Sequence, residues 1–255
     1  MSNTTTHTLG FYDPLTYRSV VGYADDGSPI WLTWRDAPAV ALAGVPGAGK
    51  THLLTALARG MREHVDVSVI DGKAGLCWDA LADDLTEFDA TGDVDIATRI
   101  VRDIVHSFAA EPPSRPKVLI VDEPSSFHPS NSDQPTDEFW NLLRHIAMRG
   151  RRHHTTVLLS TQRGLTLPSW FLDNATVTLA LPMVELDALR FAESLREHIA
   201  TDPGEFTSRR LAIHDQRSGV AVGSTREPAA VHSPSCDCVE RATALLTKHA
   251  VHSAA

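Results

Sequence analysis

The chain has 255 residues, of which 42% are hydrophobic, 22% charged and 6% aromatic, a composition that excludes disordered, collagen-like and coiled-coil proteins. Its formal net charge of −9 provides no chain-wide positive field, so any contact with nucleic acid is expected to be local. Three cysteines are too few for a disulfide framework, and we expect neither a signal peptide nor a membrane span. These features predict a soluble, cytoplasmic protein.

Short β-rich runs alternate with longer helical patterns along the chain, which is typical of a parallel sheet with crossover helices. Val20–Trp34 holds the turn Asp25-Asp26-Gly27 between two apolar runs and predicts a hairpin. The near-continuous apolar run Ala39–Ala43 predicts a central parallel strand, and a helix is expected to begin at Lys50. Val65–Ile70 predicts the second core strand.

The middle of the chain continues this alternation. Residues 94–109 carry apolar side chains at helical spacing, and KVLIVDE (117–123) predicts the third core strand. After a polar loop, Glu138–Met148 has an apolar face and predicts an amphipathic helix. Thr155–Ser160 and Thr176–Leu181 predict the fourth and fifth strands, so a five-stranded core sheet is expected.

Beyond this point the pattern weakens. Leu186–His198 predicts a helix, Leu211–His214 and Gly219–Gly223 are β-like, and Val239–Lys248 predicts a final helix.

The alternation of strand and helix patterns also predicts how the chain divides into domains. We expect an N-terminal tail (1–18), one core domain (19–200) and a C-terminal extension packed on or trailing the core (201–255). The predicted fold class is α/β, a mostly parallel central sheet with helices on both faces and an N-terminal β-hairpin entry.

A phosphate-binding motif, G-x-x-x-x-G-K-[ST], lies between the first core strand and the first helix. It consists of Gly44, Val45, Pro46, Gly47, Ala48, Gly49, Lys50 and Thr51. Glycines let the loop turn its N–H groups towards an anion, and the helix N-terminus adds its positive dipole end. Lys50 is expected to reach the β- and γ-phosphates of ATP, Thr51 to ligate Mg²⁺, and the adjacent His52 to line the nucleotide site. The motif and its context predict a P-loop NTPase of RecA-like fold.

Two acids follow the third core strand, which is the Walker B pattern. Asp122 is expected to hold Mg²⁺ beside Thr51, and Glu123 to orient and deprotonate an attacking water. This pair predicts ATP hydrolysis rather than binding alone.

Two further features have less specific patterns. Gln162, at the end of the fourth strand, is a candidate sensor of the γ-phosphate or simply a polar strand end. A basic run precedes that strand, and Arg151 within it is a candidate catalytic arginine, with Arg149 and Arg152 as rivals. A solvated helix end whose cations complement the dipole explains the run equally well.

From about Val21 to Pro182 the chain resembles the FtsK/SpoIIIE-type DNA translocases of the FtsK/HerA group of P-loop ATPases. The resemblance rests on the order and spacing of five features, which are GYADDGSPIWLTWRDAP, AVALAGVPGAGKT, the strand ending in Asp71-Gly72-Lys73, VLIVDE, and VLLSTQR. The family has Asp-Pro-Lys at the third position and Ala-Thr-Gln-Arg-Pro at the fifth. Departures such as Ala39 in place of a histidine and Gly164 in place of a proline mark a distant member.

The resemblance implies an ATP-dependent motor that binds double-stranded DNA without sequence preference and assembles as a homo-oligomer, such as a hexameric ring. It also places Arg151 nearest to a role in the neighbouring subunit's site. An alternative from another class is a P-loop ATPase that moves or remodels protein, or a nucleotide-gated switch, and the acidic charge balance favours it.

Overall fold

The computed structural model describes residues 7–73, 75–110, 114–127, 137–163, 166–184, 191 and 210–226. Its strands are β1 (Tyr12–Asp13), β2 (Arg18–Tyr23), β3 (Pro29–Thr33), β4 (Ala39–Ala43), β5 (Asp66–Asp71), β6 (Glu87–Asp89), β7 (Lys117–Asp122), β8 (Thr155–Thr161), β9 (Val177–Ala180), β10 (Arg210–Asp215) and β11 (Gly219–Ser224). Its helices are α1 (Lys50–Met61), α2 (Val94–His106), α3 (Asp137–Arg149) and α4 (Ser169–Asn174), and the 3₁₀ helices η1 (Leu76–Asp84), η2 (Ser107–Ala109), η3 (Pro124–Phe127) and η5 (Gly150–His153).

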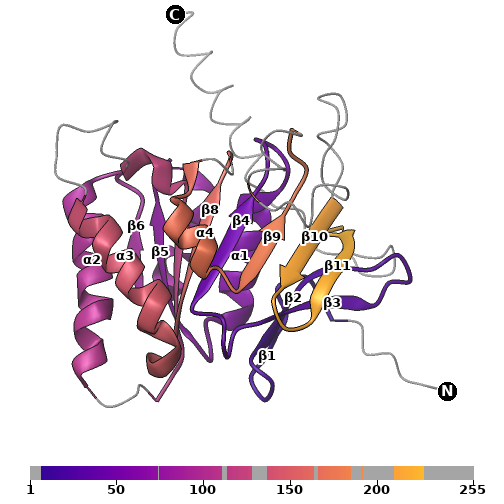
Figure 1. Cartoon of the computed structure of the whole chain (residues 1–255), viewed down its shortest axis with the longest axis horizontal. Coiled ribbons are helices and arrows are strands. Elements are labelled where there is room, and N and C mark those ends of the chain that lie inside the picture. The colour runs from indigo at the N-terminus through magenta and orange to yellow at the C-terminus, as the bar shows by residue number, and fades with distance from the viewer. Residues whose placement is uncertain are drawn as a thin grey trace, which may run out of the picture.

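In the described part of the chain, eleven strands form one mixed sheet, in the order β1-β2-β11-β10-β9-β4-β8-β7-β5-β6, with β3 paired to β2 (Figure 1). The strands from β9 to β6 are parallel. The other five strands, β1, β2, β3, β10 and β11, pair antiparallel, and we call them the antiparallel wing. The fold class predicted from the sequence is confirmed, but the prediction of five core strands is wrong. The short strand β6 was missed, and the two β-like runs of the C-terminal part extend the same sheet through β9.

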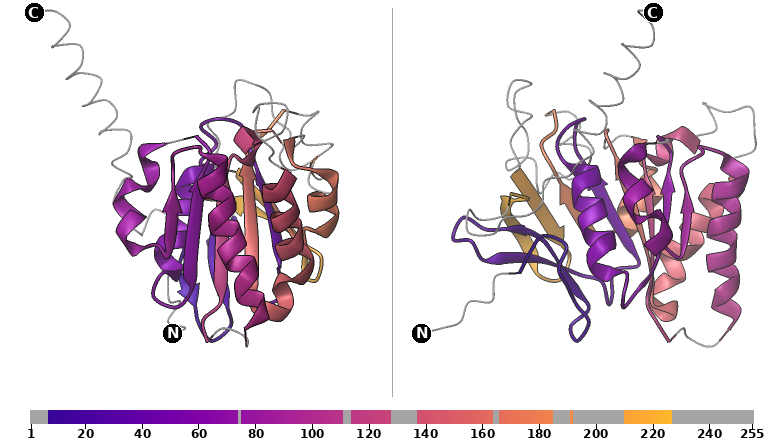
Figure 2. Two further views of the ribbon diagram at one scale, coloured as in Figure 1. Left: turned by 90° about the vertical axis from the view of Figure 1, so that its left-hand side faces the viewer. Right: turned by 180° about the vertical axis from the view of Figure 1, so that it is seen from behind.

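Helices cover both faces of the parallel part of the sheet. Figures 1 and 2 show α1 on one face and α3 and α4 on the other, with α2 beside α3. The strand β4 lies between β8 and β9, and all five of its residues are buried, as its unbroken apolar sequence predicts. Helices on both faces of the sheet therefore exclude water from β4, the strand that leads into the predicted phosphate loop.

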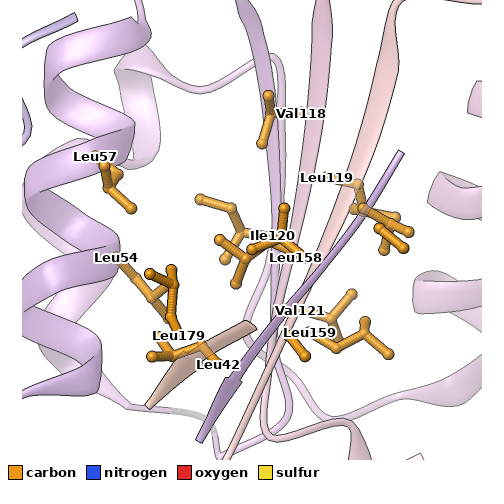
Figure 3. Packing of buried hydrophobic residues seen from close by; sticks show 14 of the residues in the cluster. Leu42, Leu54, Leu57, Val118, Leu119, Ile120, Val121, Leu158, Leu159 and Leu179 are labelled. Atoms are coloured by element: carbon orange, nitrogen blue, oxygen red, sulfur yellow. The ribbon is translucent and has the colours of Figure 1, made fainter. Parts of the chain in front are cut away.

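The core between α1 and the sheet is formed by aliphatic side chains. Leu54 and Leu57 project from α1 towards Leu42 and Leu179, which come from two adjacent strands (Figure 3). All four side chains have no exposed surface. This packing fixes the axis of α1, and with it the direction of the helix N-terminus.

The predicted N-terminal hairpin is present. β2 and β3 pair antiparallel around a turn in which Ser28 N donates to Asp26 Oδ1 at 2.9 Å. Gly27 has φ +80°, a left-handed conformation that glycine adopts without a steric penalty.

The antiparallel wing contacts the core through β10, which pairs with β9, and through β1 and β2, which contact α1. The backbone just before β1 also lies directly against α1. A Cβ at Gly10 would overlap the Ala56 carbonyl of α1, and one at Gly60 would overlap the Gly10 carbonyl. Only glycines at these positions permit such a close approach of the two backbones.

Two predicted helices, Leu186–His198 apart from residue 191 and Val239–Lys248, lie outside the described residues. Within the described ranges, no helix has both the length and the apolar character needed to cross a bilayer.

Candidate functional site

The predicted phosphate loop, residues 44–49, connects the carboxyl end of β4 to the first residue of α1. Both strands that flank β4 hold it, because Gly44 N donates to Thr161 O at 3.2 Å and Val45 N donates to Pro182 O at 2.9 Å. Gly47 and Gly49 have φ of +81° and +99°, which bends the loop back over the helix N-terminus. The loop is thus fixed at its base and curved at its tip, where Pro46 and Gly47 are exposed.

The side chain of Lys50 is buried against the loop. Its Nζ donates to Gly44 O at 2.6 Å and to Val45 O at 3.1 Å, and the residue is 4% exposed. Burial and, to a smaller extent, the positive charge of Lys73 lower the pKa of Lys50 to about 8, against the opposing effect of Asp122 and Glu123. A buried ammonium with a lowered pKa is stabilised by an incoming anion, so this loop fits a phosphate group.

Oxygen atoms from three elements converge next to Lys50. Thr51 Oγ1 of α1 donates to Asp122 Oδ2 of β7 at 3.1 Å, and Ser160 Oγ of β8 donates to Asp122 Oδ1 at 3.0 Å. Hydroxyl and carboxylate oxygens are the ligands that Mg²⁺ prefers, so the donor set fits this ion. The residues present could therefore hold Mg²⁺ with Thr51 and Asp122.

Glu123 is held in one orientation by three hydrogen bonds and one ion pair. Its Oε1 accepts from Ser125 Oγ at 2.6 Å and from Thr161 Oγ1 at 3.0 Å, and its Oε2 accepts from Gln162 N at 3.0 Å. The Lys73 ammonium forms the ion pair, 3.5 Å from Oε2. The backbone of Glu123 is left-handed, with φ +62°, which is uncommon for a residue with a side chain. The backbone at this position is attached to β8, because Glu123 N donates to Ser160 O at 2.7 Å.

Gln162 and His52 are placed near the site in different ways. The contact of Gln162 with Glu123 is through its backbone N–H, and its side chain is half-buried. His52 lies in the first turn of α1 and is also half-buried.

Lys73 was missed as a site residue by sequence reasoning. Its Nζ is 3.5 Å from Asp122 Oδ1 and 3.5 Å from Glu123 Oε2. The signal in the sequence was the string Asp71-Gly72-Lys73 after a core strand, to which no chemical role was attached. The turn brings this lysine to the same edge because β5 and β7 are adjacent parallel strands.

Arg151 lies at the amino ends of the parallel strands, whereas the phosphate loop lies at their carboxyl ends. It belongs to η5, which precedes the amino end of β8, and its Nε donates to Asp36 Oδ1 at 3.0 Å. Arg217 also pairs with Asp36. The structure does not bring Arg151 to the phosphate loop of its own chain, and Arg149 and Arg152 are exposed near it.

Residues 40–183, which span the strands from β4 to β9, match the ATPase family associated with various cellular activities (AAA). The match covers more than half of the chain and includes the loop, the two acids and the strand ending at Thr161. The chain belongs to this AAA family of ATPases. A search of curated protein sequences finds no relative.

Solved structures similar to this AAA chain share its fold at low sequence identity. The cytoplasmic domain of the type VII secretion ATPase EccC from Thermomonospora curvata has a TM-score of 0.64 and 15% identity, covering 87% of this chain and 28% of that one. The pCW3 conjugation coupling protein TcpA has a TM-score of 0.65 and 12% identity, covering 86% and 70%. The genome-packaging NTPase B204 of Sulfolobus turreted icosahedral virus 2 has a TM-score of 0.53 and 17% identity, covering 74% and 97%. The chain spans little more than a quarter of the EccC domain.

Proposed function

We propose that this AAA ATPase is a motor of the FtsK type, which hydrolyses ATP to move along double-stranded DNA as a ring of identical subunits. The observation that carries the ATPase chemistry is the hydrogen bond between Thr51 and Asp122, with Glu123 adjacent in the chain. It joins a phosphate loop to a carboxylate pair at one edge of a parallel sheet, the place where such sheets bind ligands.

In the proposed reaction, the loop and Lys50 bind the β- and γ-phosphates through N–H donors. Thr51 and Asp122 hold Mg²⁺, which when bound supplies positive charge against the triphosphate. Glu123 accepts the proton of the attacking water at its carboxylate, and Thr161 Oγ1 and Gln162 N keep that carboxylate oriented. Gln162, through its side chain, and His52 line the nucleotide site.

Duplex DNA as the cargo is supported by the order of the five motifs and by structural neighbours described as a conjugation coupling protein and a genome-packaging NTPase. A protein cargo is the second candidate. It is favoured by the net charge of −9 and by the likeness to a secretion ATPase.

A steady-state ATPase assay with and without linear duplex DNA tests the proposal. We expect hydrolysis that duplex DNA stimulates and that rising salt suppresses, because sequence-independent contacts to phosphates release counterions. Lys50→Ala, which removes the cation from the phosphate site, should abolish tight ATP binding. If an unfolded polypeptide stimulates hydrolysis and DNA does not, the cargo is protein and the proposal of a DNA motor is wrong.

A further inference from the structure

The ammonium of Lys73 lies between the two carboxylates of the Walker B pair. Its Nζ is 3.5 Å from both Asp122 Oδ1 and Glu123 Oε2, whereas the Lys50 ammonium donates to loop carbonyls instead. Asp122 and Glu123 are buried, and buried carboxylates in proteins are paired with a positive charge or with hydrogen-bond donors. Among the residues that the structure describes, Lys73 is the cation that forms ion pairs with both.

The turn that carries Lys73 is attached to β7 and to the residues that follow it. Gly72 N donates to Asp122 O at 2.9 Å, and Ser126 Oγ donates to Gly72 O at 2.7 Å. A Cβ at Gly72 would lie 2.5 Å from the Glu123 carbonyl oxygen, so the two backbones are in direct contact. The backbone of the turn is therefore fixed relative to Asp122 and Glu123.

Asp71 closes the turn from inside. Its Oδ1 accepts from Lys73 N at 2.9 Å and its Oδ2 accepts from Gly75 N at 2.8 Å. The side chain of Lys73, by contrast, is 29% exposed and has four rotatable bonds. A fixed backbone with a partly exposed side chain allows the ammonium to leave the carboxylates while the turn stays in place.

We propose that the Lys73 ammonium is a tethered counter-cation of Asp122 and Glu123 that competes with Mg²⁺ for this carboxylate pair. The proposal rests on the proposed ATPase function, because it assigns Mg²⁺ to Asp122. The ammonium lies at Asp122 Oδ1, whereas Thr51 contacts Oδ2, so Mg²⁺ held by Thr51 and Asp122 would share one carboxylate with Lys73, and two cations at one carboxylate repel each other. Binding of Mg²⁺ with nucleotide therefore favours movement of the Lys73 ammonium away from Asp122, and this movement also removes its ion pair with Glu123.

The test compares nucleotide affinity with and without the metal ion. A fluorescent ATP analogue with a hydrolysis-resistant γ-phosphate is titrated into the full chain in EDTA and in saturating Mg²⁺. Lys73→Met removes the charge and keeps the length of the side chain, and Lys73→Arg keeps the charge. Lys117→Met is the matched control, because Lys117 begins the same strand β7 and its ammonium bonds to Ser107 at the other edge.

Lys73→Met should weaken binding in EDTA, because two uncompensated carboxylates then face the phosphates. It should tighten binding in Mg²⁺, so that the ratio of the two affinities rises by about tenfold. Lys73→Arg and Lys117→Met should keep the ratio of the unaltered chain, and thermal melting checks that each variant is folded.

Two results would overturn the inference alone. Weaker binding of Lys73→Met in both titrations would make Lys73 a direct phosphate ligand, and an unchanged ratio would make it a structural ion pair. Failure of the unaltered chain to bind the analogue in either titration would instead remove the proposed function, and the inference with it.

Discussion

The Glu123 carboxylate accepts hydrogen bonds at both of its oxygens, from Ser125 Oγ, Thr161 Oγ1 and Gln162 N. This arrangement orients a general base, and proton transfer to that base requires a carboxylate at this position. Glu123→Gln should keep nucleotide binding and lower turnover by about 10²–10⁴-fold, because an amide does not accept the proton of water. Equilibrium binding and steady-state hydrolysis measure the two effects. Glu63→Gln, an exposed position after α1, is the control, and equal turnover of both variants would remove Glu123 from the mechanism.

The buried Lys50 makes stability depend on pH. Its pKa is lowered from 10.5 to about 8 in the folded chain, so between these pH values the unfolded chain binds more protons. The free energy of unfolding should therefore rise with pH across this interval, by at most about 1.4 kcal/mol per unit. In Lys50→Met this contribution is absent. Urea denaturation of both chains from pH 7 to 10 measures the difference, and parallel curves would contradict the burial of a charged Lys50.

The proximity of Lys50 and Thr51 to Asp122 and Glu123 was predicted from the two motifs, because the carboxyl ends of parallel strands lie at the same edge of a sheet. The position of Lys73 could not be predicted in the same way. It depends on the conformation of the turn from Asp71 to Lys73 and on backbone contact with Glu123, which no residue pattern specifies. The contact of Gln162 through its backbone is equally invisible in a sequence.

The helix α1 positions Lys50 and Thr51, since it begins at Lys50 and packs on β4. Leu54→Ala should lower the free energy of unfolding by about 2–5 kcal/mol, because it opens a cavity under Leu42 and Leu179. Leu15→Ala, at a position 86% exposed, is the matched control and should change stability by less than about 0.5 kcal/mol. Urea denaturation gives both values. Equal losses would show that α1 does not pack as described.

The core strands β4 and β7 were predicted almost to the residue because both are continuous apolar runs buried on two faces. The strand β6 was not, since Glu87–Asp89 is three residues long and two of the three are acidic. The strand β10 joins the same sheet by pairing with β9, about thirty residues earlier in the chain, and β11 joins it by pairing with β10 and β2. Local periodicity identifies β-like runs but carries no information about such distant partners.

For the whole molecule, the position of Arg151 bears on assembly. It lies at the amino end of β8, away from its own phosphate loop, so a catalytic role requires a neighbouring subunit. If that role holds, Arg151→Ala lowers ATPase activity by about 10³–10⁵-fold, and mixing it with Glu123→Gln restores part of the rate. The restored rate comes from interfaces that combine an intact acid with an intact arginine. If the mixture is no more active than its components in the same ATPase assay, Arg151 has no role in a neighbouring site, and the basic run is a solvated helix end.

The close contact of Gly10 with α1, together with the β9–β10 ladder, has a consequence for amide hydrogen exchange. A ligand at 100 times its Kd adds about 2.7 kcal/mol to global stability, which slows exchange through complete unfolding by about a hundredfold. Because the antiparallel wing is attached to α1, which begins at the phosphate loop, and to β9, which pairs with β4, β10 amides should gain the same protection as those of β4 when nucleotide is added. Exchange measured by mass spectrometry on peptides from both strands tests this expectation. Protection confined to β4 would show that the wing opens as a separate cooperative unit.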